Sequence, residues 1–368
     1  MLDPFAGMGT SLLEANLLGL DASGYEPHPF FVDICSAKLS TRAVEQVDEV
    51  IDCLSRIRPV DDVEKAWSPT ALLYLSKLVD RENLALLAGA RSLEPLCPTE
   101  ARPLYRLIVS RLLELAAGSK TDGIYKAPTT LKRSISVAAS VGPLLRQVRE
   151  DVEDLPVVLG DSVLTAASSE DMSRLPQESH DICVTSPPYL NNFDFAEMTR
   201  MELYFWEYAS TWSEITERVR ARLIVNTTTA PTKLRRDQSR WADMLPDDFR
   251  RILEPLIEQL AGQRRVRAGR KEYDSLVLPY FAQMRRVVQE VHRVLKPGAP
   301  FHTVVADAAL YGVHIHTEEL LADLMVRAGF DVKEIVRLRN RGGRWVLAKR
   351  QGAATPLGEF HIRAMKKP

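Results

Sequence analysis

Hydrophobic and polar positions divide the chain into short apolar runs and longer amphipathic stretches. The short runs, bounded by glycine or polar residues, predict strands at 1–5, 22–26, 155–162, 181–186 and 300–307. Apolar residues at helical spacing predict helices over "SLLEANLL", "PTALLYLSKLV", "RPLYRLIVSRLLELAA", "LPYFAQMRRVVQEVHRVL" and "TEELLADLMVRAG". Strands that alternate with helices indicate an α/β fold with a mostly parallel sheet.

Two segments depart from this alternation. From about Ala43 to Val152 the chain reads as helices with loops, and near the end "FDVKEIVRLRN" and "RWVLAKR" flank "RGGR" and predict a hairpin. We therefore expect five parts: the start of the α/β domain at 1–43, a helical insertion at 44–151, the α/β domain again at 152–206, a mixed region at 207–275, and the end of the α/β domain at 276–368.

Composition limits the class of protein. The 368 residues carry a formal net charge of −1, so any contact with nucleic acid has to be a local patch. The four cysteines form no CxxC pair, which argues against a zinc site or a disulfide framework and fits a cytoplasmic protein. No apolar run reaches the ~20 residues that span a bilayer, and the N-terminus has no signal-peptide pattern.

A glycine-rich turn follows the first predicted strand. In "DPFAGMGT", Gly7 and Gly9 allow close approach of a nucleotide-like cofactor, and Thr10 is a good N-cap for the next helix. Glu26 follows Gly7 by 19 positions, near the spacing of an acid that binds ribose hydroxyls. Leu12 stands where a dinucleotide fingerprint has its third glycine, which weakens an NAD interpretation. An ordinary helix-leading turn is the alternative.

A second motif ends the predicted strand at 181–186. In "TSPPY" two consecutive prolines fix the backbone and remove two N–H donors, so the strand must stop. A tight surface turn is the plain interpretation. A rigid loop of this kind could also hold carbonyl oxygens and a serine oxygen in fixed positions beside a substrate.

Together, "DPFAGMGT" and "TSPPY" resemble the motifs of the DNA N4-cytosine/N6-adenine amino-methyltransferases. The resemblance implies a Rossmann-like class I methyltransferase fold, with a mostly parallel twisted sheet, a C-terminal hairpin and a helical insertion. It implies S-adenosyl-L-methionine as cofactor and DNA as partner. The SPPY form is most typical of the N4-cytosine enzymes, so methylation of N4 of cytosine is favoured over N6 of adenine.

The resemblance also assigns residues. The implied cofactor-binding residues are Asp3, Phe5, Gly7, Gly9, Glu26 and Asp161, with Glu26 on the ribose and Asp161 on the adenine amino group. The implied catalytic residues are Ser186, Pro187, Pro188 and Tyr189, with Tyr189 stacking on a flipped-out base. Asn191 to Asp194 are further candidates for the pocket wall. A turn-capping aspartate is the alternative for Asp161, and a plain loop is the alternative for Asn191 and Asn192.

A basic stretch lies between the second motif and the last strands. Between residues 218 and 271 there are 14 Lys and Arg against 6 Asp and Glu, which suits a phosphate-contacting surface. We take 207–275 as the candidate target-recognition region, with Arg264, Arg265, Arg267, Arg270 and Lys271 as the candidate nucleic-acid-binding residues. A solvated basic loop is the alternative. The pair His314 and His316 lacks a matching ligand set, so we expect no metal site.

Three other functions remain open at this stage. Similar Pro-Pro-Tyr loops serve other planar amines, so the acceptor could be RNA or a protein glutamine. The chain could also be a nucleic-acid-binding half of a split enzyme, because the glycine motif begins at Leu2, where related enzymes often have an upstream helix. The sequence then predicts either a misplaced start, an N-terminal partner chain or a degraded pocket. A restriction or defence-system partner is a further expectation.

Overall fold

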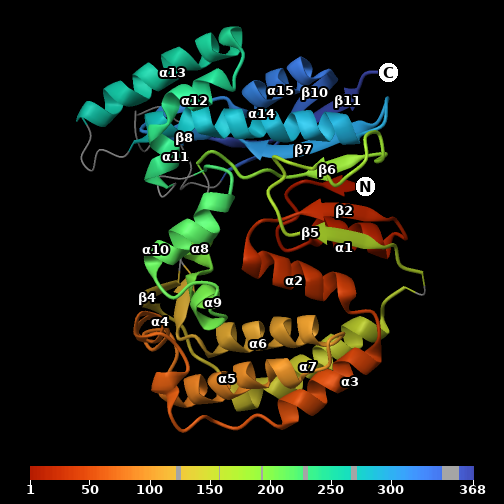
Figure 1. Ribbon diagram of the computed structural model, residues 1–368, viewed down its shortest axis with the longest axis vertical. Helices are drawn as coiled ribbons and strands as arrows, with labels where there is room; N and C mark the ends of the chain where they lie inside the picture. The colour runs from red at the N-terminus through yellow and green to blue at the C-terminus, as the bar shows by residue number, and fades with distance from the viewer. Residues whose placement is uncertain (122–125, 157, 192–193, 227–230, 267–271, 342–355) are drawn as a thin grey trace.

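The chain forms a seven-stranded sheet with a separate helical lobe below it (Figure 1). The computed structural model describes residues 1–121, 126–156, 158–191, 194–226, 231–266, 272–341 and 356–368. From one edge to the other, the sheet contains β5 (Ser162–Thr165), β2 (Ala22–Tyr25), β1 (Leu2–Asp3), β6 (Cys183–Thr185), β7 (Pro300–Ala306), β11 (Gly358–Lys366) and β10 (Phe330–Asn340).

The strand order identifies the fold. Five neighbouring strands, β5-β2-β1-β6-β7, pair in parallel, and they follow the order 3-2-1-4-5 of a doubly wound sheet. Strand β11 runs antiparallel between β7 and β10 and closes the sheet as a hairpin. This arrangement confirms the predicted Rossmann-like class I methyltransferase fold with a C-terminal hairpin. It also brings the carboxyl ends of β1, β2, β5 and β6 to one edge, where such folds bind ligands.

Helices cover the two faces of the sheet. They are α1 (Thr10–Leu17) and α2 (Pro29–Ser40) on one face, and α14 (Val277–Val294) and α15 (Thr317–Ala328) on the other. Side chains alternate between the faces as strand geometry requires. Leu2 and Cys183 are buried in one core with α14 and α15, whereas Ala22 and Leu164 pack in the other with α1 and α2.

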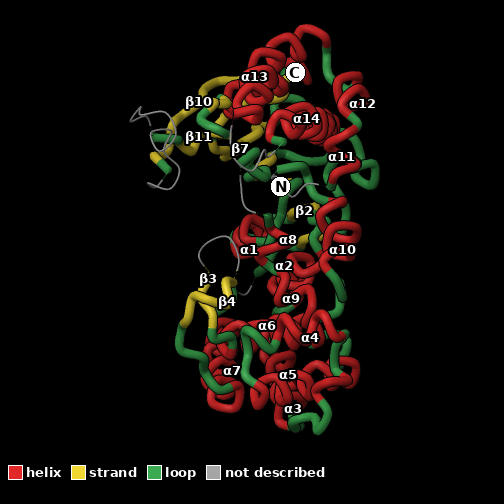
Figure 2. Tube along the Cα trace, turned by 90° about the vertical axis from the view of Figure 1, so that its left-hand side faces the viewer, coloured by secondary structure: helices red, strands yellow, loops and turns green. Residues whose placement is uncertain are grey.

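The helical lobe occupies the lower half of Figures 1 and 2 and has its own hydrophobic core. It contains α3 (Val44–Ser55), α4 (Pro69–Leu75), α5 (Arg81–Leu93), α6 (Arg102–Ala116), α7 (Val137–Glu153) and 3₁₀ turns at Val63–Lys65 and Glu94–Leu96. Helices therefore occupy the stretch where the hydrophobic pattern placed them. A small hairpin that the sequence did not predict, β3 (Ser119–Thr121) with β4 (Lys126–Leu131), interrupts them.

The region after the second motif is divided between the lobe and the sheet domain. The lobe takes α8 (Phe195–Met198), α9 (Arg200–Phe205), α10 (Trp212–Glu214) and the turns Ile215–Val219 and Arg220–Arg222; the sheet domain takes α11 (Thr232–Arg236), α12 (Gln238–Asp243), α13 (Asp247–Val266) and the turn Tyr273–Leu276. Ile215 and Val219 belong to the core of the lobe, whereas Trp241 and Phe249 pack with α14. The stretch 207–275 is thus not one structural unit. None of the described helices is long and apolar enough to cross a membrane.

The strand expected at 155–162 is wrong in position. The strand that pairs with β2 is β5, which begins at Ser162, and the apolar run before it lies outside the sheet with Val158 73% exposed. Between the two segments the backbone of Gly160 lies close against Leu20, since an added Cβ there would meet the Leu20 carbonyl oxygen at 2.1 Å. Pairing with β2, rather than local hydrophobicity, decided where the strand begins.

The C-terminal hairpin is present with a different second strand. The partner of β10 is β11, whereas the expected partner, 344–350, lies outside the described residues. Strand β11 pairs on both sides and buries Ile362 and Ala364, which secures its central place in the sheet. A second small hairpin follows β7, formed by β8 (Ala308–Leu310) and β9 (Val313–Ile315).

Gly9 occupies the N-cap position of α1, where we expected Thr10, and its φ is +80°. A Cβ at Gly9 would lie 2.5 Å from the Cys35 Sγ, whereas Gly19, with φ +72°, has nothing within 4 Å. We expect Gly9→Ala to destabilise the fold by more than the ~1–2 kcal/mol of a left-handed backbone. Gly19→Ala, the matched control, should show the backbone cost alone in chemical denaturation. Equal losses would contradict the role given to the Cys35 contact.

Candidate active site

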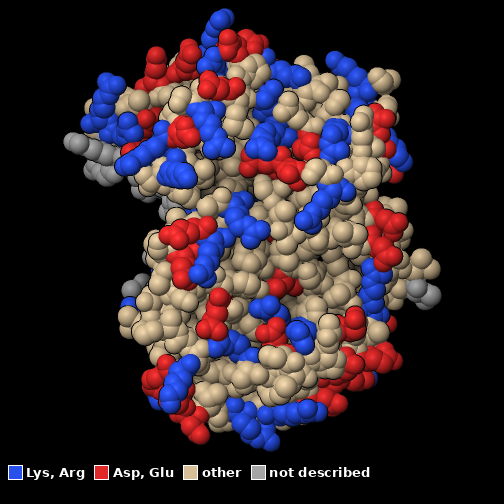
Figure 3. Space-filling view, in the orientation of Figure 1, with Lys and Arg blue, Asp and Glu red and all other residues tan. Residues whose placement is uncertain are grey.

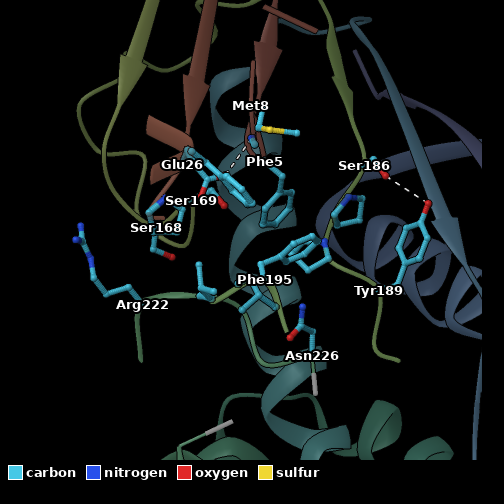
Figure 4. Close-up of a pocket in the computed structure, with 17 residues that line it drawn as sticks. Phe5, Met8, Glu26, Ser168, Ser169, Ser186, Tyr189, Phe195, Arg222 and Asn226 are labelled. Atoms are coloured by element: carbon cyan, nitrogen blue, oxygen red, sulfur yellow. Dashed lines mark hydrogen bonds between the residues drawn. The ribbon is translucent and has the colours of Figure 1, made fainter. Parts of the chain in front are cut away.

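The carboxyl ends of the parallel strands enclose a pocket of about 330 Å³ (Figure 4). This volume lies within the range of small-molecule sites. The lining residues come from both sequence motifs and from segments far from them in the sequence: Phe5, Gly7, Met8, Glu26, Pro27, Phe31, Ser168, Ser169, Ser186, Pro187, Pro188, Tyr189, Phe195, Arg222, Leu223, Ile224 and Asn226. One cavity therefore joins the glycine turn to the SPPY loop.

Glu26 places a buried carboxylate on the wall beside the glycine turn. Its Oε2 accepts a hydrogen bond from the Gly7 N–H at 3.0 Å, and its Oε1 accepts one from the His28 N–H at 2.7 Å. Burial raises the pKa of Glu26 to about 7, although both backbone donors act to lower it, and the nearby Asp3 adds to the rise. A carboxylate here can accept hydrogen bonds from a diol when it is ionised.

Asp3 lies behind the pocket wall. It accepts hydrogen bonds from the Thr185 hydroxyl at 2.6 Å, from the Phe5 N–H at 3.0 Å and from the Ser11 hydroxyl. Burial raises the pKa of this carboxyl. The residue thus ties β1 to the end of β6 and the start of α1. Its contacts fix the glycine turn against the SPPY loop without lining the cavity.

Two other residues implied by the resemblance lie outside the lining. Gly9, at the start of α1, lies against Cys35 of α2. Asp161 precedes β5 instead of following it, and its exposed carboxylate pairs with Arg42 at 3.1 Å. The segment that does follow β5 contributes Ser168 and Ser169 to the wall (Figure 4). The sequence missed both serines because it ended the strand too early.

The SPPY loop forms the opposite side of the cavity. The Ser186 hydroxyl donates a hydrogen bond to the Val304 carbonyl at 3.0 Å, and its oxygen lies 3.5 Å from the Tyr189 hydroxyl (Figure 4). Burial raises the pKa of Tyr189. The Arg341 guanidinium lies 5.5 Å from the centre of the Tyr189 ring and donates to the Asn191 Oδ1 at 3.0 Å. The tyrosine is therefore braced from the end of β10.

The segment after Tyr189 contributes less than expected. Asn191 is engaged by Arg341, and Asp194 caps α8 and pairs with the buried Arg220 at 2.7 Å. Neither residue lines the cavity, and Asn192 and Phe193 lie outside the described residues. Phe195, one residue further on, does line it. Figure 4 shows this ring beside Phe5, in the middle of the site.

Several arginines of the basic stretch form ion pairs within the protein. Arg220 is buried with Asp194, Arg235 pairs with Glu272 at 2.7 Å, and Arg264 pairs with Asp274 at 3.2 Å. Arg265 is exposed at the end of α13. Arg267, Arg270 and Lys271 lie outside the described residues. On the face of the molecule that Figure 3 shows, Lys and Arg are interspersed with Asp and Glu at this end.

The two histidines after β7 have acidic partners. The His314 Nε2 lies 2.8 Å from the Asp307 carboxylate, and the His316 Nδ1 lies 3.2 Å from that of Glu318. Ligand atoms of His316, Glu318 and Glu319 lie within 4.8 Å of one another and could hold a metal ion. None of the three lines the pocket. The sequence argument missed the pair of glutamates that begins α15.

Known proteins include distant relatives of this chain. No family model matches the chain. It is 21% identical, over 92% of its length and 74% of theirs, to the Type II methyltransferases M.AvaI of Nostoc sp. and Anabaena variabilis. It is also 21% identical to the Type II methyltransferase M.BsoBI of Geobacillus stearothermophilus, over 93% of the chain and 75% of the relative.

Solved structures give weaker matches. A SAM-dependent methyltransferase from Methanosarcina mazei is 10% identical with a TM-score of 0.34, aligned over 100% of this chain and 91% of its own. A Thermus thermophilus protein in complex with S-adenosyl-L-methionine is 22% identical with a TM-score of 0.20, over 24% and 38% of the two chains. The fold assignment therefore rests on the strand order of this sheet. The chain is a distant relative of proteins named Type II methyltransferases.

The pocket residues would fit S-adenosylmethionine, the cofactor that the sequence motifs imply. Glu26 offers a carboxylate for ribose hydroxyls, Phe31 and Pro27 offer flat apolar surface for a purine ring, and the glycine turn leaves room for a polar chain. Glu26 and the buried Asp3 place two carboxyl groups on this wall, which suits the positive charge of a sulfonium.

Cofactor affinity should rise with pH because of Glu26. Two ribose hydroxyls favour the ionised carboxylate, so binding should release a proton and strengthen by about tenfold between pH 6 and pH 8. Calorimetry in buffers of different ionisation enthalpy measures both effects. Glu26→Gln should bind more weakly and should lose the pH dependence that Glu26 causes. Any dependence that remains in this variant belongs to the cofactor's own amino group, which titrates at ~8. A parent protein whose affinity and proton release do not vary with pH would contradict this role.

Proposed function

We propose that the protein is a site-specific DNA methyltransferase that moves a methyl group from S-adenosylmethionine to an exocyclic amine, with N4 of cytosine favoured over N6 of adenine. The observation that carries the proposal is the single cavity lined by Gly7 and Glu26 at one end and by the SPPY loop at the other. The relatives' names support DNA as the acceptor and favour a place in a restriction-modification system. A partner enzyme and a cytoplasmic location stay predictions.

The SPPY loop can orient an amine for this transfer. The Ser186 hydroxyl donates its proton to the Val304 carbonyl, so its two lone pairs can accept, one from the Tyr189 hydroxyl at 3.5 Å and one from an amine N–H. The Pro187 carbonyl is a second acceptor with a fixed direction. Two acceptors draw the amine nitrogen away from conjugation with its ring and aim its lone pair. The cofactor, when bound, supplies an electrophilic methyl group on a sulfonium, and the methylated amine then loses a proton to water.

Tyr189 supports the proposed handling of the base. A base in a duplex must leave the stack to reach such a cavity, which costs a few kcal/mol. Stacking on an aromatic ring returns about 1–3 kcal/mol per base. Tyr189 lines the cavity while Arg341 braces its ring, so the ring is held ready for this contact. The preference for cytosine rests on the SPPY form of the motif alone.

The acceptor is identified by incubating the full chain with labelled cofactor and with DNA, tRNA or a protein mixture, then digesting each product. N4-methylcytosine from DNA is the expected result, and N6-methyladenine would correct the target base. Label found in RNA or protein alone would instead indicate methylation of RNA or of a protein glutamine. Cofactor binding without transfer to any acceptor, or no binding at all, would favour a non-autonomous half of a split enzyme.

Ser186→Ala and Tyr189→Ala should separate chemistry from cofactor binding. Both should lower single-turnover methyl transfer by at least about 100-fold, because they remove an acceptor for the amine and the stacking surface. Cofactor affinity by calorimetry should stay within about twofold, since Glu26 and Phe31 are untouched. Loss of cofactor binding in Tyr189→Ala would show that the tyrosine belongs to the cofactor wall instead.

Arg265 and Arg264 form a matched pair for testing DNA contact. The exposed Arg265 is available to a phosphate, so Arg265→Ala should weaken DNA binding and reduce the salt dependence of the affinity by about one counterion. Arg264→Ala breaks the pair with Asp274 and should lower thermal stability with a smaller effect on the salt slope. Binding is measured by fluorescence anisotropy over a salt series. An unchanged slope in Arg265→Ala would remove the end of α13 from the DNA interface.

A further inference from the structure

Helix α14 carries two side chains that bind opposite walls of the pocket. Tyr280 donates a hydrogen bond from its hydroxyl to the Pro188 carbonyl in the SPPY loop at 2.9 Å. Gln283, one helical turn further on, accepts from the Val225 N–H at 2.9 Å and donates to the Glu170 carboxylate at 3.0 Å. Val225 lies between two lining residues, and Glu170 directly follows Ser169. One face of a single helix thus holds three separate segments of the wall.

Tyr280 is well suited to hold the loop rigidly. Its side chain is 0% exposed, and its ring packs edge-on against that of Phe281 at 5.1 Å between centres. Burial, with a smaller contribution from Tyr189, raises the pKa of its phenol, so the hydroxyl stays a donor at any physiological pH. Helix α14 is itself anchored in the main core by Val287, Val288 and Val291. The donor therefore has little freedom to follow the loop if it moves.

The hydrogen bond also divides the carbonyls of the loop between two tasks. The Pro188 carbonyl is occupied by Tyr280, while in the described part of the chain we find no protein donor on the Pro187 carbonyl. That leaves the Pro187 carbonyl and the Ser186 oxygen, two acceptors, for the two N–H groups of a primary amine. A loop that rotated about its prolines would misdirect both.

We propose that Tyr280 is a positioning residue for methyl transfer, which fixes the SPPY loop through the Pro188 carbonyl so that Ser186 and Pro187 face the target amine. The proposal rests on the proposed function for its kinetic consequence, because positioning matters only if an amine is received there. It adds a residue outside both sequence motifs, because Tyr280 lies on α14, 91 positions after Tyr189.

The chain provides a close control. Tyr105, on α6 in the helical lobe, is also 0% exposed and donates its hydroxyl to a backbone carbonyl, that of Ala90, at 2.6 Å. Tyr280→Phe and Tyr105→Phe each remove one buried phenol hydroxyl and leave a carbonyl unpaired, with no change of shape. They should lower the thermal midpoint by similar amounts. Only the first should touch the site.

Two measurements test the proposal. Single-turnover transfer to DNA should fall at least about tenfold in Tyr280→Phe, with cofactor affinity within about twofold, and should be unchanged in Tyr105→Phe. Hydrogen exchange of the peptide containing residues 186–191 should accelerate at least about tenfold in Tyr280→Phe alone, because the loop loses its anchor.

The outcomes separate the two proposals. If the parent protein transfers no methyl group to DNA, the proposed function fails, and the exchange measurement still decides whether Tyr280 holds the loop. If exchange of the loop is unchanged in Tyr280→Phe, or if transfer falls equally in both variants, the positioning role is overturned. Faster exchange with full transfer activity would also overturn it, since the loop would then be held without consequence for the reaction.

Discussion

The buried carboxylate of Asp3 is the contact on which the site depends. It receives the hydroxyl of Thr185, 182 positions away in the sequence, at the point where β6 passes into the SPPY loop. It also receives the Phe5 N–H and the Ser11 hydroxyl, which fix the glycine turn and the start of α1. A buried carboxylate is costly unless its lone pairs are satisfied, so the three donors and the acid stabilise one arrangement. Both motifs are held in register by this arrangement.

Around that contact, the pocket is assembled from segments that share no local sequence signal. The turn after β5, the loop after the helical lobe and the SPPY loop each contribute wall residues, and side chains of α14 bind all three. Helix α14 is buried on the face of the sheet opposite α1 and α2, so it acts as a common rigid support. The helical lobe reaches the site through α8, where Phe195 completes the apolar surface.

Several features could be predicted because they depend on residues close together in the sequence. The glycine turn, the proline pair and the amphipathic helices produce recognisable patterns, and strands that alternate with helices indicate a mostly parallel sheet. Errors came where pairing overrides propensity. The apolar run before β5 lies outside the sheet, and the strand that pairs with β10 is β11. As a result, Ser168 and Ser169 line the cavity, whereas Asp161 pairs with Arg42 outside it. In addition, Arg220 and Arg264 of the basic stretch pair with acids that lie outside the segment over which charges were counted.

By itself, the sequence determined the fold class and the two motifs, because each depends on local patterns of residue types. Glu26 also belongs to this group, since its distance from Gly7 spans a single strand–helix–strand unit. Only the tertiary structure decided which motif residues face the cavity and which support it from behind. It also decided that Tyr280, Gln283 and Arg341 hold the wall. Contacts of this kind join elements far apart in the chain, and no local pattern records which side chain will meet which carbonyl when the helices pack.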